Sequence, residues 1–234
     1  MSLNPLLNVH GLKRHYTMAS GVVKALDGVD LSVEKGERIL LLGPSGSGKT
    51  TLLNCIAALD TPTEGDYQFE GNAVPRSKTE EMTTFRRHNI GYVFQFFNLL
   101  QDLTVLENIL LIQELAGKRD EKRARMLLEL VGLQAEVDRF PAEISGGQQQ
   151  RVAIARSLAK SPKLLLGDEL TGNLDSTTSG MVMDALVKAC ETEGITAIMV
   201  THDESLVKYA TRVIRLDSGK VISDEAVSSP PSAS

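Results

Sequence analysis

The stretch GPSGSGKTT, which runs from Gly43 to Thr51, decides the fold of this chain. It matches the pattern G-x-x-x-x-G-K-[ST], whose fixed positions are two glycines, a lysine and a hydroxyl residue. The apolar run RILLL precedes it, and the helix-like segment TTLLNCIAAL follows it. This order of strand, loop and helix is the context that a phosphate-binding loop requires. The stretch therefore predicts a P-loop in an α/β fold.

The residue types of the loop suit the binding of nucleotide phosphates. Glycines let backbone N–H groups converge on phosphate oxygens, and the start of a helix adds partial positive charge there. We expect Lys49 to reach the β- and γ-phosphates and the Thr50 hydroxyl to bind Mg²⁺. A chance glycine-rich loop is the alternative, and the flanking strand and helix argue against it. The predicted nucleotide-binding positions are Gly43, Pro44, Ser45, Gly46, Ser47, Gly48, Lys49, Thr50 and Thr51.

The composition is that of a soluble globular protein. The chain has 234 residues, of which 42% are hydrophobic and 24% charged, so it can bury a substantial core. Its 25 basic and 30 acidic residues give a net charge of −5. Because it contains no dense Lys/Arg tract, we do not expect nucleic acid as a partner.

Cysteine usage and hydropathy indicate a cytoplasmic protein. Cys55 and Cys190 stand far apart in apolar helical contexts and resemble small core residues, which favours a reducing compartment. The start does not resemble a signal peptide, and no apolar run approaches the roughly 20 residues that span a bilayer. We expect any membrane role to run through a partner.

Hydrophobic patterns predict the organisation of the chain. Alternation in GVDLSVEKGE and YQFEGNAV indicates an N-terminal antiparallel β subdomain, whereas RILLLG, KLLLGD and ITAIMVTHD read as buried parallel strands. Apolar residues recur at helical spacing in TVLENILLIQELAG and EKRARMLLELVGL. We expect one α/β domain over residues 1–222, with a RecA-like P-loop core and a helical subdomain inserted at about 90–160. The few apolar residues in 223–234 predict a disordered tail.

Polar side chains follow the predicted core strands. Asp168 and Glu169 end KLLLGDE, and ligands of open α/β sheets gather at the carboxyl ends of strands. Asp168 is expected to hold Mg²⁺ and Glu169 to polarise an attacking water. His202 and Gln95 follow two further apolar runs and could contact the γ-phosphate, the metal or the water. A lone histidine or glutamine at a strand end is more often structural.

A second glycine pair begins another predicted helix, in ISGGQQQR. Ser145 is a good N-cap, and Gly146 and Gly147 would expose the N–H groups of the first turn. A plain cap needs at most one glycine. Two glycines followed by Gln148 indicate that an anion approaches the backbone closely. The residues alone leave open which phosphate this is.

The chain resembles the ATP-binding-cassette (ABC) ATPase family. The resemblance rests on motifs that occur in the family's order: GPSGSGKTT, Gln95, ISGGQQQR, LLLGDE, NLD and THD. The likeness extends from Tyr16 to about Ile222, and SGGQ is the family signature, which small-molecule kinases lack. In this family two cassettes pack head to tail, and the signature of one closes on the γ-phosphate held by the other. The resemblance therefore implies ATP and Mg²⁺ as cofactors and a second copy of the chain as partner. The residues expected to bind ATP in trans are Ser145, Gly146, Gly147 and Gln148.

The resemblance assigns further roles and also shows departures. Tyr16 resembles the aromatic that stacks on adenine, although an isolated tyrosine there would more often be core, and Asp175 in NLD resembles the loop that crosses the dimer interface. The family usually has proline where this chain has Leu170, and alanine is common where it has Gly167. We expect these two residues together to loosen the loop that carries Glu169.

FQFFNLLQDLTVLENI and TGNLDS resemble the branch of the family that includes macrolide-exporter, lipoprotein-releasing and cell-division complexes. This implies an ATPase on the inner face of the cell membrane, bound to an integral membrane permease subunit. A soluble ABC ATPase acting on nucleic acid or ribosomes is the alternative. The permease is expected to dock on an apolar cluster, for which packing within the helical subdomain is the competing explanation. The cluster comprises Phe96, Phe97, Leu99, Leu100 and Leu103.

Overall fold

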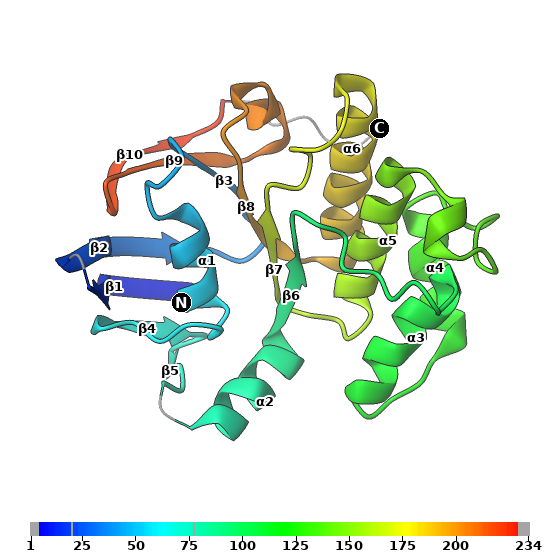
Figure 1. Cartoon of the computed structure of the whole chain (residues 1–234), viewed down its shortest axis with the longest axis horizontal. Coiled ribbons are helices and arrows are strands. Elements are labelled where there is room, and N and C mark those ends of the chain that lie inside the picture. The colour runs from blue at the N-terminus through cyan, green and yellow to red at the C-terminus, as the bar shows by residue number, and fades with distance from the viewer. Residues whose placement is uncertain (1–4, 20, 77, 229–234) are drawn as a thin grey trace. The chain divides into compact units, whose positions relative to one another are not determined.

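The computed structural model describes residues 5–19, 21–76 and 78–228 (Figure 1). The chain divides into two compact units. Within the described residues, the first unit comprises those up to 86 and from 196 onward. The second unit comprises residues 87–195. Both units combine strands with helices, which confirms the predicted α/β class.

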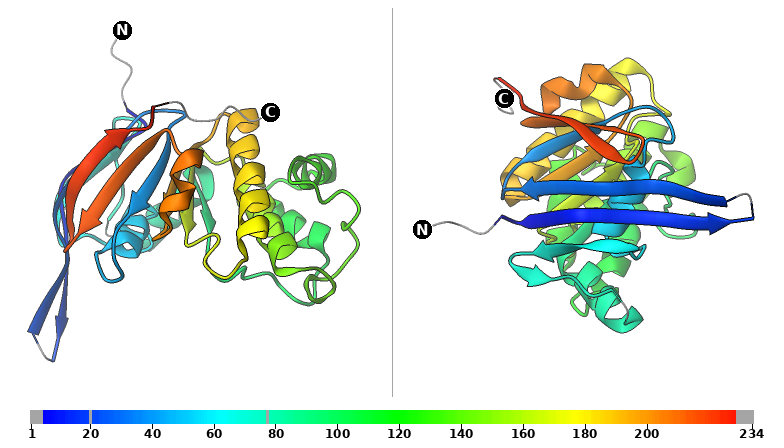
Figure 2. Two further views of the ribbon diagram at one scale, coloured as in Figure 1. Left: turned by 90° about the horizontal axis from the view of Figure 1, so that it is seen from above. Right: turned by 90° about the vertical axis from the view of Figure 1, so that its left-hand side faces the viewer.

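An antiparallel sheet with the order β2–β1–β4–β5 forms one part of the first unit. Its longest strands, β1 and β2, form a hairpin that Figure 2 shows side by side. In β2, Val29, Leu31 and Val33 are buried while Asp30 and Ser32 are exposed, so the alternation of the sequence confirms the predicted half-buried strand. The strands are β1 (Leu7–Met18), β2 (Gly21–Val33), β4 (Glu64–Phe69) and β5 (Asn72–Ala73).

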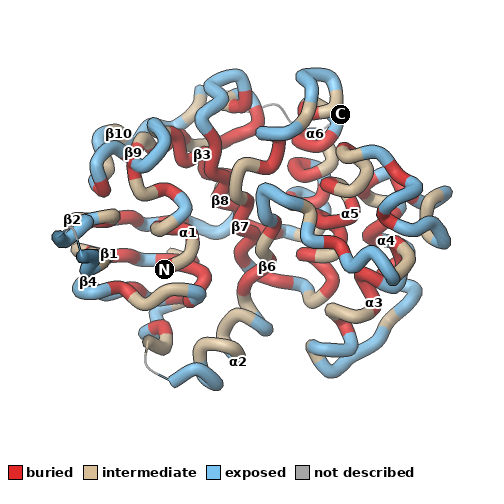
Figure 3. The backbone as a smooth tube through the Cα atoms, in the orientation of Figure 1, coloured by how far each residue is buried: buried red, intermediate tan, exposed pale blue. Residues whose placement is uncertain are grey.

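The other strands of the first unit have the order β10–β9–β3–β8. β3 (Arg38–Leu42) runs parallel to β8 (Thr196–Val200) and β9 (Arg212–Asp217). β3 and β8 are buried along their length, as the red colour in Figure 3 shows. Continuous apolar runs are typical of parallel strands that are covered on both faces. Helix α1 (Lys49–Ile56) follows β3, and the short 3₁₀ helix η2 (Glu204–Tyr209) follows β8.

The prediction of a disordered tail from residue 223 is wrong for its first part. β10 (Lys220–Ala226) pairs antiparallel with β9, and the Arg212 guanidinium binds both carboxylate oxygens of Asp224 at 2.6 Å. A polar segment can form such a strand because β9 satisfies its backbone groups, while its largely exposed side chains need no apolar character. Residues 229–234 lie outside the described part of the chain.

The second unit contains two parallel strands and four long helices. β6 (Ile90–Val93) begins where α2 (Thr79–Asn89) ends, and it pairs with β7 (Leu164–Asp168). The predicted helices appear as α3 and α4, and Thr104 caps α3 through a reciprocal pair of bonds with Glu107. The helices are α3 (Val105–Leu115), α4 (Glu121–Leu130), α5 (Gly146–Leu158) and α6 (Ser176–Glu193), with the 3₁₀ helix η1 (Pro141–Glu143) before α5.

Two further observations bear on the sequence predictions. Cys55 and Cys190 are both buried free thiols, as expected of core residues. Among the described residues, none of the helices has the length and apolar character needed to cross a membrane.

Candidate functional site

The predicted P-loop lies between β3 and α1, as its pattern requires. Pro44, Ser45 and Thr50 are exposed to solvent, whereas Lys49 is only 7% exposed. The Lys49 ammonium donates hydrogen bonds to the carbonyl oxygens of Gly43 at 2.7 Å and Pro44 at 2.9 Å. These bonds hold a positive charge against the loop, within reach of an anion that the exposed residues would contact.

Glycine is required in the loop for two separate reasons, close packing and backbone conformation. A Cβ on Gly43 or Gly48 would lie 2.1 or 2.3 Å from a backbone carbonyl oxygen of the same unit, so the packing of the chain itself excludes a side chain there. Gly46 has open space around it but a φ of +80°, which favours glycine. Ser47 Oγ is buried and has no hydrogen-bond partner among the described residues. A buried hydroxyl of this kind fits a loop that receives a phosphate oxygen.

His202 is placed at the same edge of the sheet as the P-loop. β3 and β8 are neighbouring parallel strands in which Leu41 lies opposite Val200, and Thr201 N donates to the carbonyl oxygen of Leu41 at 3.2 Å. His202 follows directly and is exposed. Within the first unit, the structure therefore brings His202 and the P-loop to the same edge of the sheet, as predicted.

Tyr16 is held by two residues that the sequence analysis missed. Its hydroxyl donates to Asp60 Oδ2 at 2.6 Å, and the Arg14 guanidinium lies over its ring at 4.3 Å from the centroid. Arg14 in turn binds both carboxylate oxygens of Asp60, at 2.8 and 2.9 Å. Arg14 and Tyr16 are two positions apart on β1 and share a face of the strand, a signal that could have indicated Arg14. Nothing local in the sequence indicates Asp60.

The predicted metal-binding and catalytic residues of the second unit follow β6 and β7. These strands are parallel, with Val93 opposite Gly167, so Gln95 and the pair Asp168–Glu169 leave the sheet at one edge. A Cβ on Gly172 would lie 3.7 Å from Glu169 Oε2 and 3.8 Å from Gln95 Nε2, which places both groups beside Gly172. Glu169 has a φ of +48°, a conformation that non-glycine residues adopt at a cost in energy.

Packing in the structure argues against the prediction that Gly167 and Leu170 loosen this loop. Leu170 is 5% exposed, and a Cβ on Gly167 would lie 2.8 to 3.0 Å from three carbon atoms of the Leu170 side chain. The leucine therefore fills the space that the glycine leaves, and the two departures from the family pattern compensate each other. The amide of Gly172 also donates to the Glu169 carbonyl at 3.2 Å, which closes a turn around this segment.

The second glycine pair, Gly146 and Gly147, begins α5, and the two glycines differ in their surroundings. Ser145 and Gln148 cap each other reciprocally, Gln148 N to Ser145 Oγ at 3.3 Å and Ser145 N to Gln148 Oε1 at 2.8 Å. A Cβ on Gly147 would lie 2.2 Å from the Thr178 methyl group. The fold thus explains Gly147 and Gln148 without a ligand. A Cβ on Gly146 would have only ordinary contacts, the nearest at 3.6 Å, so the fold does not explain Gly146.

Asp175 is the N-cap of α6. Its carboxylate accepts hydrogen bonds from Thr177 N and Thr178 N at 3.0 Å and from Thr178 Oγ1 at 2.6 Å. The bond from the Thr178 hydroxyl and those from the two amides lower the pKa of this carboxyl. Asp175 is therefore ionised at neutral pH and orients Thr178, whose methyl group lies at Gly147.

The apolar cluster after Gln95 is partly buried and partly exposed. Leu99 is 6% exposed and packs within the unit, whereas Phe96 is 69% and Leu100 48% exposed. Arg156 of α5 donates to the carbonyl oxygens of Phe97 at 2.9 Å and Asn98 at 2.5 Å, which fixes the backbone that carries the exposed side chains.

Comparison with known proteins agrees with this geometry. Residues 26–172 match the family model for the ABC transporter. A dimeric structure of a post-hydrolysis state of the ATP-binding cassette MJ0796, bound to ADP and Pi, superposes with a TM-score of 0.86 at 38% identity and covers 95% of this chain and 99% of that one. The fold and site thus define a P-loop ATPase of the cassette type. The chain belongs to the ABC transporter family, as an ATP-binding subunit that hydrolyses ATP.

Two curated relatives are named as ATP-binding proteins of a release system and of an export system. It is 45% identical to the lipoprotein-releasing system ATP-binding protein LolD of Geobacter metallireducens, over 95% of this chain and all of that protein. It is 42% identical to the macrolide export ATP-binding/permease protein MacB of Rhodopirellula baltica, over 94% of this chain and 33% of that protein. The predicted family and branch are therefore confirmed.

Proposed function

We propose that two copies of this chain close around ATP and thereby move an integral membrane permease subunit on the inner face of the cell membrane. The LolD match spans the whole of an ATP-binding protein, and the MacB match covers a third of a combined ATP-binding and permease protein. Both comparisons support a chain that supplies the ATP-driven part of a complex.

The observation that carries the proposal is the start of α5. Gly146 has room for a side chain that it lacks, and the first N–H groups of the helix have no partner further back in the helix. Such a helix start binds an anion well. The P-loop of the same chain has its own lysine and its own helix start. We assign the α5 start, with Ser145, Gly146, Gly147 and Gln148, to the γ-phosphate held by the other copy.

The residues placed above divide the reaction between them. Lys49 would bind the β- and γ-phosphates, Tyr16 would stack on adenine, and Asp175 would stand at the interface between copies. Glu169 would take the proton of a water whose oxygen attacks the γ-phosphorus, as the bond to the β–γ bridging oxygen breaks and ADP and phosphate form. His202 would orient that water.

Mg²⁺ is proposed from the donor set rather than from an acidic cluster. In the described residues no three acidic, histidine or cysteine side chains gather as a metal site. Thr50, Gln95 and Asp168 supply a hydroxyl, an amide and a carboxylate oxygen, the hard donors that Mg²⁺ prefers alongside nucleotide phosphates. When bound, Mg²⁺ would neutralise charge on the transferring phosphoryl group.

Glu169→Gln tests the proposal. The variant keeps the shape of the side chain but cannot accept the proton, so ATP should bind without being cleaved. We expect it to accumulate as an ATP-dependent dimer on a sizing column and to lose at least a hundredfold in turnover, at the lower end of the effect of removing a general base. A variant that stays monomeric with saturating ATP and Mg²⁺, also beside its permease, would contradict the proposal.

Lys49→Ala is the control for nucleotide occupancy. Added to Glu169→Gln, it should abolish both ATP binding and the dimer, because the loop loses the charge that meets the phosphates. If the double variant still dimerised with ATP, the association would not depend on the P-loop.

A further inference from the structure

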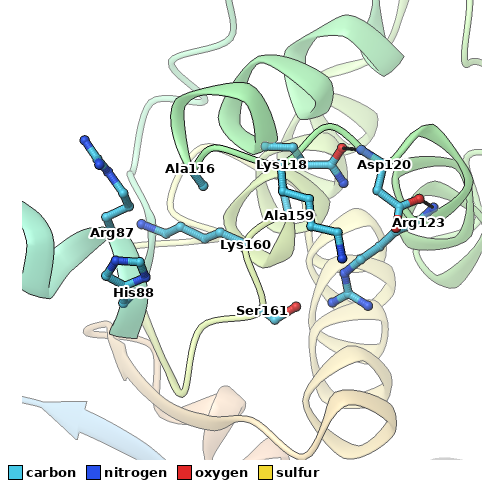
Figure 4. Close-up of a pocket in the computed structure, with 10 residues that line it drawn as sticks. Arg87, His88, Ala116, Lys118, Asp120, Arg123, Ala159, Lys160 and Ser161 are labelled. Carbon is cyan, nitrogen blue, oxygen red and sulfur yellow. Dashed lines mark hydrogen bonds between the residues drawn. The ribbon is translucent and has the colours of Figure 1, made fainter.

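A pocket of about 220 Å³ lies in the second unit, where several helices end (Figure 4). The ends of α2, α3 and α5 contribute to it, together with the turn before α4 and α4 itself. Five of its ten lining residues are basic. The six that matter for its chemistry are Arg87, His88, Gln113, Lys118, Arg123 and Lys160.

The lining carries an excess of positive charge although the chain as a whole has a net charge of −5. Its only carboxylate among the described lining residues is Asp120, which accepts a hydrogen bond from Arg123 N at 3.0 Å as the N-cap of α4. Glu193, outside the lining, pairs with the Arg123 guanidinium at 2.5 Å. The lysine and arginine residues of the lining are Arg87, Lys118, Arg123 and Lys160.

Two buried donors in the lining have no acceptor in the part of the chain that the structure describes. Gln113 is 2% exposed, and its Oε1 accepts a hydrogen bond from Asp120 N at 2.8 Å, which fixes the amide. Gln113 Nε2 and Arg123 Nε are both buried and have no hydrogen-bond partner among the described residues. Unpaired buried donors cost folding free energy unless an acceptor enters. A ligand that only accepts hydrogen bonds would satisfy both.

The ends of the helices offer a partial alternative explanation for the positive charge of the pocket. Basic side chains near the C-terminus of a helix complement its dipole, and three helices end here. That accounts for the charges of Arg87 and Lys160 but not for the two buried donors. The volume is below the roughly 300 Å³ at which pockets for drug-sized ligands begin, so the pocket suits a small occupant.

We propose that this pocket binds a small anion of the phosphate class. Gln113 Nε2 and Arg123 Nε donate to its oxygens, and Lys118 and Lys160 supply charge at the mouth. The phosphate comes either from a free ion, such as inorganic phosphate or pyrophosphate, or from the headgroup of an anionic lipid. No P-loop residue lines this pocket, and the inference does not depend on ATP hydrolysis.

Titration of the full chain with pyrophosphate tests this site. It is done in the Lys49→Ala background, and in parallel on the wild-type chain with its P-loop saturated by ADP, so that the P-loop does not contribute. We expect saturable binding by calorimetry and a shift of the Gln113 side-chain amide signal in ¹⁵N spectra, assigned by its loss in Gln113→Leu. Lys118→Gln and Lys160→Gln should each weaken binding by about fivefold, the effect of one charge at contact distance in water.

Lys122→Gln is the matched control, because Lys122 is an exposed residue of α4 outside the pocket. It should leave the affinity unchanged. Vesicles of phosphatidylcholine with and without phosphatidic acid distinguish the sources: sedimentation that requires phosphatidic acid and is lost in Lys118→Gln assigns a headgroup, and pyrophosphate binding alone assigns a free ion. The proposal is overturned if neither probe binds, if Lys122→Gln weakens binding as much as Lys118→Gln, or if the Gln113 signal does not move.

Discussion

Asp60 shows how one residue outside every sequence motif fixes a proposed ligand contact. Burial of this carboxyl opposes ionisation, but hydrogen bonds from Tyr16 and Arg14 outweigh it, and the net result is a lowered pKa. The same two bonds hold the Tyr16 ring and the guanidinium above it. The orientation of Tyr16 therefore depends on a charge that the sequence analysis did not identify.

Asp60→Asn should reveal this charge through the pH dependence of stability. A lowered folded-state pKa stabilises the protein at pH values above the unfolded pKa of about 3.9, and this contribution is lost as pH falls through the lower, folded value. At pH 7 the variant should lose about 1–3 kcal/mol of unfolding free energy, measured by urea denaturation. The difference from wild type should shrink as the pH falls below about 4.

Glu64→Gln is the matched control for this measurement. Glu64 also pairs with a cation, Lys13 at 2.7 Å, but its side chain is 59% exposed. Because exposed ion pairs contribute little, this variant should follow the wild-type curve at every pH. Equal losses in the two variants would refute a special role for Asp60.

The turns that carry the predicted catalytic residues are stabilised by pairs of residues that act together. Gly167 lies at the end of β7, and Leu170 packs onto it from the following turn. The left-handed conformation of Glu169 lies between them. Gly167 and Leu170, the two residues that depart from the family pattern, therefore pack against each other. This contact stabilises the turn in place of the proline that the family usually has at position 170.

Gly167→Ala should destabilise the protein by about 1–3 kcal/mol, because the new methyl group would overlap the Leu170 side chain. In a Leu170→Ala background the same change should cost less, with a coupling energy of about 0.5–3 kcal/mol. Denaturation of the two single variants and the double variant measures this coupling. Additive losses would show that the two residues are independent.

Gly146 and Gly147 provide a comparison at the start of α5. Gly147→Ala should destabilise the protein by about 1–3 kcal/mol, because its Cβ would meet the Thr178 methyl group. Thr178→Ser should relieve this loss, since it removes the methyl group but keeps the hydroxyl that binds Asp175.

Gly146→Ala should fold normally, because its Cβ has room. In the Glu169→Gln background it should nevertheless weaken the ATP-dependent dimer, measured by sizing chromatography, if ATP approaches the backbone there. An unchanged dimer would show that Gly146 does not face the ligand.

At the scale of the whole molecule, two large apolar side chains after Gln95 remain exposed. Phe96 and Leu100 project from a segment that Arg156 holds through two backbone carbonyls. Exposed large apolar side chains on a fixed backbone are typical of a docking surface for another protein. We therefore expect the permease to contact these two side chains, which the following variants test.

Phe96→Ser combined with Leu100→Ser should leave the ATPase rate of the isolated chain unchanged, because neither residue belongs to the proposed reaction site. The variant should fail to copurify with its permease from membranes, since the contact loses two apolar anchors. Met126→Ser, which removes an exposed apolar side chain of α4, is the matched control and should copurify normally. If the double variant still copurified with the permease, the permease would contact a different part of the chain.

The sequence by itself determined the P-loop, the order of the family motifs, the alternating and buried strands, and the cap of α5 by Ser145. These features are encoded within a few neighbouring residues, through hydrophobic period, turn chemistry and capping. Only the tertiary structure decided that Thr178 requires Gly147, that Leu170 packs on Gly167, that Asp60 holds Tyr16, and that 223–226 form a strand. Each of these depends on a contact made by the folded chain, most of them with a partner distant in sequence, and no local pattern specifies such a contact.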